Sequence, residues 1–128
     1  MTARTFKFTT ANTTNLRQVA QGPSVFKGGS FVNTTDDPYY VKLYWFQPTA
    51  SAATPTVGTT IPQMTIAVPP LDVSTFGQPG TICPSWPDGI NGGQGQLFVA
   101  VTGAAGDTDT TAVASGQGVI TLLVDGAP

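Results

Sequence analysis

The sequence predicts an all-β protein: a single-domain antiparallel β-sandwich, jelly-roll or Ig-like, with about seven or eight short strands and an extended N-terminal arm. Three observations predict this class. The chain has 128 residues, which suits one domain, and only 9% are charged, against about 25% in an average soluble domain. It contains 21 Thr, 15 Gly and 11 Pro, and no Glu. Thr is β-branched and favours strands, whereas helix surfaces need long straight side chains, so a mainly helical protein is excluded.

Alternation of apolar and polar residues locates the individual strands. Residues 5–10 alternate two Phe with Thr and Lys, and residues 16–19 form a weaker strand or an extended arm. Residues 39–46 form the clearest strand, and residues 118–124 are apolar apart from one Thr. The full set of predicted strands is residues 5–10, 16–19, 30–35, 39–46, 61–68, 71–76, 96–102 and 118–124.

Gly, Pro and Asp mark the connections between these strands. Residues 21–29 contain Pro23 and the pair Gly28-Gly29, so we expect a turn there. Asp36-Asp37-Pro38 predicts a second tight turn. A long link at residues 47–60 and a Gly- and Pro-rich excursion at residues 77–95 follow. We therefore divide the one domain into an arm with the first strands at residues 1–29 and a sandwich body at residues 30–128.

Absent residues narrow the chemistry. With no His, the usual general base and most zinc and iron sites lose their commonest residue, and we predict no enzyme, no catalytic residue, no cofactor and no metal site. The lone Cys83 cannot form an internal disulfide, and we expect a small buried hydrophobe or a thiol in a reducing compartment. Prolines interrupt the uncharged stretch at residues 43–71, so no membrane segment is expected, and residues 1–10 do not resemble a signal peptide.

Charge is unevenly distributed along the chain. All five basic residues lie in the first 42 positions, whereas the remainder contains five Asp and no Lys or Arg. The basic N-terminal arm of one subunit could bind an acidic surface on another subunit, because complementary charges favour association. An ordinary surface with solvated charges explains the same distribution equally well. Five scattered cations and a net charge of −2 argue against nucleic acid as a partner.

The strand at residues 39–46 has large side chains on both faces. The odd positions, Tyr39, Val41, Leu43 and Trp45, are expected in the core. The even positions are too apolar for a fully wet face, which leaves three alternatives: a loop of the same chain covers them, a subunit or capsid surface covers them, or they stack on a sugar. Including residues of the arm and a later Trp, the interface candidates are Arg4, Phe6, Lys7, Phe8, Arg17, Tyr40, Lys42, Tyr44, Phe46 and Trp86.

Asp107-Thr108-Asp109 lies in a Gly-rich loop. Its carboxylates could bind calcium, but the further acidic positions of a calcium loop are missing. A loop tip shaped by Asx turns is the favoured interpretation.

Four ordered segments carry a family resemblance. They are YVKLY at 40–44, ATPTVGTTIP at 53–62, TIAVP at 65–69 and GDTDTTAV at 106–113. Over roughly residues 30–124 the chain resembles small proteins encoded among the structural genes of tailed bacteriophages, and departs from them in its long N-terminal arm and around residues 77–88.

This resemblance implies a non-enzymatic virion component, a decoration or cement protein on the capsid exterior that bridges capsid subunits. The partners it implies are the major capsid protein and copies of the chain itself, with a trimer expected by analogy with other decoration proteins. The alternative is a tail, fibre or host-surface recognition module that binds carbohydrate through Tyr40, Tyr44, Phe46 or Trp86. A surface low in Lys and Glu suits packing against neighbours in either case.

Overall fold

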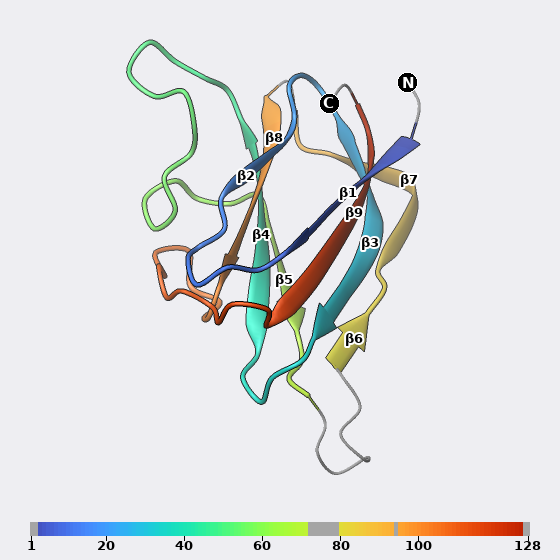
Figure 1. Cartoon of the computed structure of the whole chain (residues 1–128). Helices are drawn as coiled ribbons and strands as arrows, with labels where there is room; N and C mark the ends of the chain where they lie inside the picture. Colours follow the sequence, from blue (N-terminus) through green and yellow to red (C-terminus); the bar gives the residue numbers. More distant parts are fainter. Residues whose placement is uncertain (1–2, 72–79, 94, 127–128) are drawn as a thin grey trace.

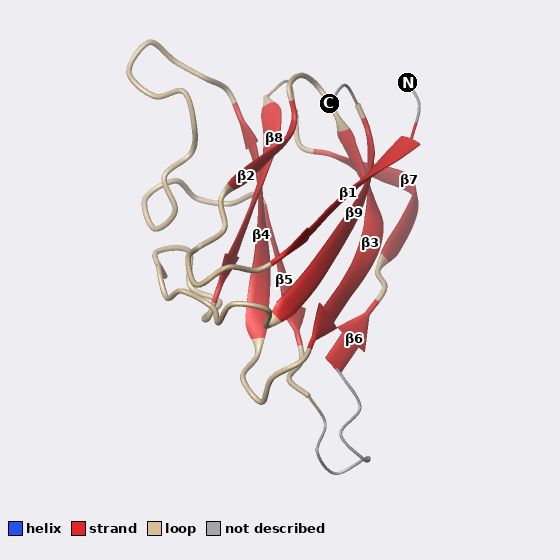
Figure 2. Cartoon of the chain, in the orientation of Figure 1, coloured by secondary structure: helices blue, strands red, loops and turns tan. Residues whose placement is uncertain are grey.

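Two antiparallel β-sheets pack face to face, and no helix occurs in the part of the chain that the structure describes (Figure 1, Figure 2). The structure is a computed structural model that describes residues 3–71, 80–93 and 95–126. Its strands are β1 (Ala3–Thr9), β2 (Arg17–Ala20), β3 (Val25–Asn33), β4 (Tyr39–Phe46), β5 (Met64–Val68), β6 (Gly80–Ile82), β7 (Ser85–Asn91), β8 (Gln96–Thr102) and β9 (Gly118–Asp125). The predicted all-β, single-domain sandwich is confirmed.

The strand order identifies the sandwich as a jelly roll. Sheet A has the order β1-β9-β3-β6, with β7 also paired to β3, and sheet B has the order β2-β8-β4-β5. Strands β6 and β7 pair with successive parts of β3, so together they occupy one strand position of sheet A. Each sheet then has four strand positions, and most connections cross from one sheet to the other, as in a jelly roll. The Ig-like alternative is thereby excluded.

The core lies between the sheets and is formed by alternate residues of the strands. The four odd positions of β4 are at most 5% exposed, as predicted. Two of them also use a polar atom: the Tyr39 hydroxyl donates to the Val32 carbonyl at 2.9 Å, and Trp45 Nε1 donates to the Ser24 carbonyl at 3.1 Å. Each large aromatic ring is therefore buried with its polar atom paired, which fixes how the sheets meet.

The first 29 residues do not form a separate arm. Strand β1 pairs with β9 along its whole length, β2 pairs with β8, and β3 already begins at Val25. The reason is burial: Phe8 is only 8% exposed within the core and Phe6 packs against it, which requires β1 to lie in the sheet. The boundary expected at residue 29 falls inside β3.

The turn expected at Gly28-Gly29 is a β-bulge in β3. The register of β3 shifts between Phe26 and Gly28, and Gly28 has φ 129°. A Cβ at Gly28 would lie 2.2 Å from the Pro84 carbonyl oxygen, so the neighbouring strand region approaches this glycine directly. Glycine inside a strand marks such bulges and close approaches as well as turns, and here the bulge is formed.

Two strands were missed by the sequence patterns. Strands β6 and β7 lie in the stretch expected to be an irregular excursion, and β7 contains Pro87. Both are edge segments that pair with β3, where a missing N–H is tolerated and alternation is weak. The strand predicted at residues 71–76 lies, apart from Leu71, outside the described residues.

Replacing the two tryptophans tests this packing. Trp45→Ala should lower the free energy of unfolding by about 3–5 kcal/mol, because a buried ring and its hydrogen bond are lost. Trp86, which is half-buried and contacts Phe26 in a tilted arrangement with ring centroids 5.4 Å apart, is the control, and Trp86→Ala should cost less. Urea unfolding followed by circular dichroism measures both. An equal or smaller loss for Trp45→Ala would contradict this placement of the core.

Candidate functional site

Loops of the same chain cover the centre of the outer face of sheet B, whereas Thr65 and Ala67 of β5 stay exposed. Tyr44, Phe98 and Ala100 form a second buried cluster on this face. Leu16 from the β1–β2 loop and Val57 from the β4–β5 loop pack against it. Of the three alternatives for the even positions of β4, coverage by the chain itself is therefore the one found, and we call this surface the covered face.

The interface prediction for β4 is accordingly wrong at its centre. Lys42 and Tyr44 are completely buried, while Tyr40 and Phe46 are half-buried. Phe46 meets Phe98 edge to face, with ring centroids 6.3 Å apart. The even positions of β4 thus form no exposed aromatic platform, either for a partner or for a sugar.

Lys42 is a charged residue beneath the β8–β9 loop. Its Nζ donates a 2.6 Å hydrogen bond to the Gly106 carbonyl. Burial lowers the pKa of Lys42, and the negative charges of Asp109 and Asp107 oppose that shift. The lysine therefore holds the loop over the face, and the two aspartates compensate its charge.

The Asp107-Thr108-Asp109 segment serves the loop itself. The Asp109 carboxylate accepts hydrogen bonds from the Ala104 and Thr111 amides, both at 3.1 Å, and from the Thr111 hydroxyl at 2.7 Å. Burial acts to raise the pKa of Asp109, but these hydrogen bonds and the Lys42 charge outweigh it, and the pKa is lowered. The carboxylate is thus occupied in shaping the loop, as the Asx-turn interpretation predicts.

The remaining interface candidates are dispersed. Phe6 and Phe8 point into the core side of β1, and the Arg17 guanidinium lies 4.7 Å from the centre of the Phe8 ring. Arg4 donates to the Gly126 carbonyl at 3.1 Å and to the Val19 carbonyl, and so links the two sheets at the β1–β2 edge. Lys7 is exposed. Among the charged candidates on β1 and β2, Lys7 and Arg17 are exposed, and Arg17 also contacts Phe8.

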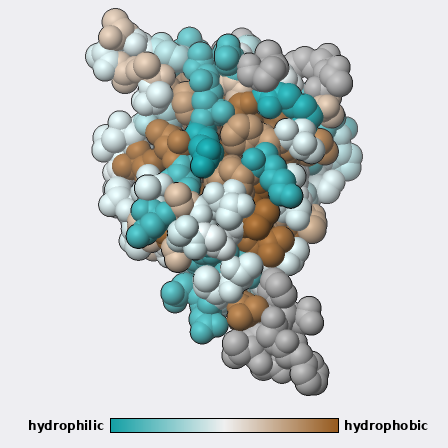
Figure 3. Space-filling view, viewed as in Figure 1, coloured by the Kyte–Doolittle hydropathy of each residue, from teal (hydrophilic) through white to brown (hydrophobic). Residues whose placement is uncertain are grey.

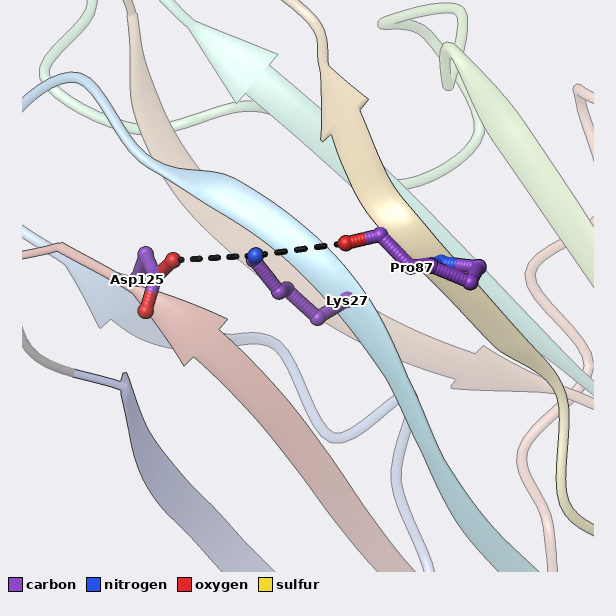
Figure 4. A network of polar contacts seen from close by, with 3 residues as sticks. All are labelled: Lys27, Pro87 and Asp125. Carbon is purple, nitrogen blue, oxygen red and sulfur yellow. Dashed lines mark hydrogen bonds and ion pairs between the residues drawn. The ribbon is translucent and has the colours of Figure 1, made fainter.

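The cations of the N-terminal region partly meet the acids of the same chain. Lys27 on β3 contacts Asp125 on β9 at 3.4 Å and reaches the Pro87 carbonyl on β7 at 3.4 Å (Figure 4). Lys42 lies near Asp107 and Asp109. The partly exposed Lys27–Asp125 ion pair contributes at most about 1 kcal/mol. Together with the hydrogen bond to Pro87, it connects β3, β9 and β7 of sheet A. Together with the Arg4 hydrogen bonds and the Arg17 contact with Phe8, four of the five cations therefore have contacts within the chain.

The outer face of sheet A is left open, in contrast to that of sheet B. Its central rows are Lys7, Thr121 and Ser30, and then Thr9, Val119, Val32 and Thr81, in register across the strands. None of these side chains is buried by the described part of the chain, and Leu123 in the neighbouring row is 37% exposed. In Figure 3, brown apolar residues lie beside pale and teal hydrophilic ones in the region of β1 and β9. We call this surface the open face.

A hollow of about 510 Å³ lies at the loop end of the sandwich. Its wall contains Asn12, Asp37 and Ser115, which come from three different loops. Sequence patterns gave no signal for it, because the three residues are far apart in the chain and are common turn residues.

Cys83 lies between β6 and β7 and is exposed, so the expected buried position is wrong.

Comparison with known proteins found no matching family model, curated protein or solved structure. Within residues 3–71, 80–93 and 95–126, no helix is long and apolar enough to cross a membrane. In the same residues, no three Cys, Asp or Glu side chains gather where they could hold a metal ion.

Removing the Tyr44 hydroxyl should stabilise the protein. This hydroxyl is buried and has no hydrogen-bond partner among the described residues. Tyr44→Phe should therefore raise the free energy of unfolding by about 1 kcal/mol, because an unpaired buried polar group is costly. Tyr39→Phe is the matched control and should lower that free energy by about 0.5–1.5 kcal/mol, since its hydroxyl is paired with Val32. Equal effects in urea unfolding would refute this assignment.

Stability should fall at alkaline pH. Burial raises the pKa of Tyr39 and Tyr44 above 10.0, and the Asp107 charge adds to the shift of Tyr44. Above about pH 10 the unfolded chain releases tyrosine protons that the folded chain retains, so stability is full below that pH and is lost as the pH rises.

Lys42, with its lowered pKa, acts in the opposite sense: stability rises with pH between its folded-state pKa and 10.5. Unfolding free energies measured from about pH 8 to about pH 12 should therefore fall more steeply in Lys42→Met than in the unsubstituted protein. A profile that is flat above pH 10 would contradict this account.

Proposed function

We propose that this chain is a non-enzymatic structural protein of a bacteriophage virion, a decoration protein on the capsid exterior that bridges capsid subunits. Its partners are the major capsid protein and copies of itself in a closed oligomer, a trimer by analogy with other decoration proteins. The resemblance of four ordered segments to phage structural proteins supports this proposal.

The observation that carries the proposal is the difference between the two outer faces. The chain uses three of its own loops to cover sheet B, whereas the open face of sheet A has no such cover within the described residues. Thr, Ser, Val and Leu dominate the open face, and Lys7 is the charged residue in its central rows. Interface cores are likewise depleted of Lys, Glu and Asp, so this composition fits a surface that is buried on assembly.

The capsid surface is the occupant that this face fits. A sheet face that consists largely of the β-branched residues Thr and Val loses little side-chain entropy on contact, because their rotamers are already restricted. Lys7 offers a donor to carbonyl or carboxylate groups of the partner. Many such modest contacts, repeated over a shell and linked within an oligomer, add by multivalency and resist the pressure of packaged DNA.

The competing function is a tail, fibre or host-surface recognition module. It predicts that the isolated protein binds host cells and that the open face stays exposed on the particle. Three of the four aromatic residues first considered for such binding are engaged within the chain: Tyr44 is buried, Phe46 meets Phe98 edge to face, and Trp86 contacts Phe26. The fourth, Tyr40, is half-buried.

Rebinding to depleted particles tests the proposal. Particles from a phage that lacks this gene should take up the purified protein in regular copy number over the shell. Thr121→Arg, at the centre of the open face, should lower occupancy at least about tenfold, because it adds bulk and charge to a packed contact. Thr65→Arg, on an exposed position of β5 in sheet B, is the matched control and should bind normally.

Thermal unfolding of both variants checks that they fold. Normal occupancy by Thr121→Arg would contradict the use of the open face. Uptake confined to the tail, or binding of the free protein to host cells alone, would favour the recognition module instead.

A further inference from the structure

Three loops meet around the hollow at one end of the sandwich. Asn12 belongs to the β1–β2 loop, Asp37 and Pro38 belong to the β3–β4 loop, and residues 111–117 belong to the β8–β9 loop. The volume of about 510 Å³ is within the usual range for small-molecule sites. The hollow lies apart from the residues that make up the open face.

A buried amide side chain fixes each of the three loops. Asn15, at φ 54° and 5% exposed, accepts from the Ala11 amide at 2.8 Å and donates to the Ala11 and Thr13 carbonyls at 2.9 and 2.8 Å. Asn33, fully buried, accepts from the Thr35 amide at 3.0 Å and donates to the Asp37 carbonyl at 2.7 Å.

Gln117 joins two of the loops. It accepts from the Ala114 amide at 2.9 Å and donates to the Asp37 carbonyl at 2.8 Å. Thr10 adds a further link, because its hydroxyl donates to the Ala114 carbonyl and accepts from the Gly118 amide, both at 3.0 Å. Burying so many polar groups is costly unless all are paired, and here they hold the backbone around the hollow in one arrangement. The backbone of the wall is therefore preorganised before any ligand arrives, and the exposed side chains of Asn12, Asp37 and Ser115 are attached to it.

Three polar side chains on this wall are left without an internal use. The Asn12 amide, the Asp37 carboxylate and the Ser115 hydroxyl make no hydrogen bond or ion pair with another described residue. They supply hydrogen-bond donors and acceptors from three directions. Pro38, Ala112 and Ala114 add apolar surface between them.

The chemistry of the wall selects the class of ligand. An anion would meet the Asp37 carboxylate without a lysine or arginine among the lining residues to balance it. A divalent metal ion needs several oxygen ligands, and Asp37 is the single carboxylate of the wall. A ring that carries neutral hydroxyl groups and C–H faces matches both the polar and the apolar residues of the wall. Its hydroxyls can donate to Asp37 and can donate to and accept from Asn12, and its C–H faces can contact the apolar residues.

We propose that this hollow is a binding site for a neutral saccharide residue, contacted by Asn12, Asp37 and Ser115. The site is independent of the proposed capsid role, because it uses the loop end and leaves the open face free.

Titration of the full-length protein with sugars, followed by two-dimensional NMR, tests this site. The probes are the methyl glycosides of glucose, galactose, mannose and N-acetylglucosamine. At least one should bind with a dissociation constant on the order of 1 mM and shift the resonances of Asn12, Asp37 and Ser115. Methyl glucuronide, which carries a carboxylate, should bind more weakly than methyl glucoside because of Asp37.

Two adjacent aspartates provide a matched pair of variants. Asp37→Ala should weaken binding at least about tenfold and remove the discrimination against the glucuronide, because it deletes a charge-assisted hydrogen bond. Asp36→Ala removes an equally exposed carboxylate that does not line the hollow, and it should bind as the unsubstituted protein does. The Asp37 carboxylate has no internal partner, so both variants should show unchanged thermal unfolding.

Absence of binding by all four neutral glycosides up to roughly 20 mM would overturn the proposal. So would binding that shifts resonances elsewhere, or binding that Asp37→Ala leaves intact. A preference for the glucuronide would likewise exclude a neutral saccharide as the ligand class.

Discussion

Strand β4 has to be covered on both faces, and much of the molecule is arranged to meet that requirement. Its odd positions lie in the core between the sheets, and its even positions include Tyr44, which is completely buried on the outer side. An aromatic surface of that size is unfavourable in water. The chain covers it with the β1–β2, β4–β5 and β8–β9 loops, which is why a link of 17 residues, 47–63, can separate two neighbouring strands of sheet B.

The covering loops explain why a lysine is buried in sheet B and why a glycine with positive φ is needed in the β4–β5 loop. Lys42 is buried because the β8–β9 loop lies over it; its ammonium group donates to the Gly106 carbonyl, and the negative charges of Asp109 and Asp107 favour its protonated form. Gly58 has φ +93°, and a Cβ there would lie 2.4 Å from the Thr110 side chain, so two covering loops meet at a glycine. Two of the covering loops, β1–β2 and β8–β9, also line the hollow, together with the β3–β4 loop. Within the described residues, no loop covers the outer face of sheet A in this way.

Sequence patterns predicted the architecture better than the surfaces. The alternation in residues 39–46 and the low charge were sufficient for a sandwich, because burial of one face of a strand has a strong period-two signal. Gly28-Gly29 misled, since glycine permits a bulge as readily as a turn and only the approach of Pro84 decides between them. Strands β6 and β7 were missed because they are short edge segments whose pairing with β3 is not encoded in local alternation. Lys42 and Tyr44 were misplaced as interface residues because covering by distant loops depends on tertiary contacts, and the hollow depends on Asn12, Asp37 and Ser115 meeting from three loops.

The central claim is that the open face of sheet A is the docking surface, whereas the covered face of sheet B is already buried by loops of the same chain and does not dock. A density map of the intact phage particle tests this claim most directly. The account predicts that the chain is found on the capsid lattice with Thr121 and Val119 against the capsid protein and the loops over Tyr44 turned away from it. A chain found only at the tail, or one seated on the capsid with the open face toward solvent, would contradict it.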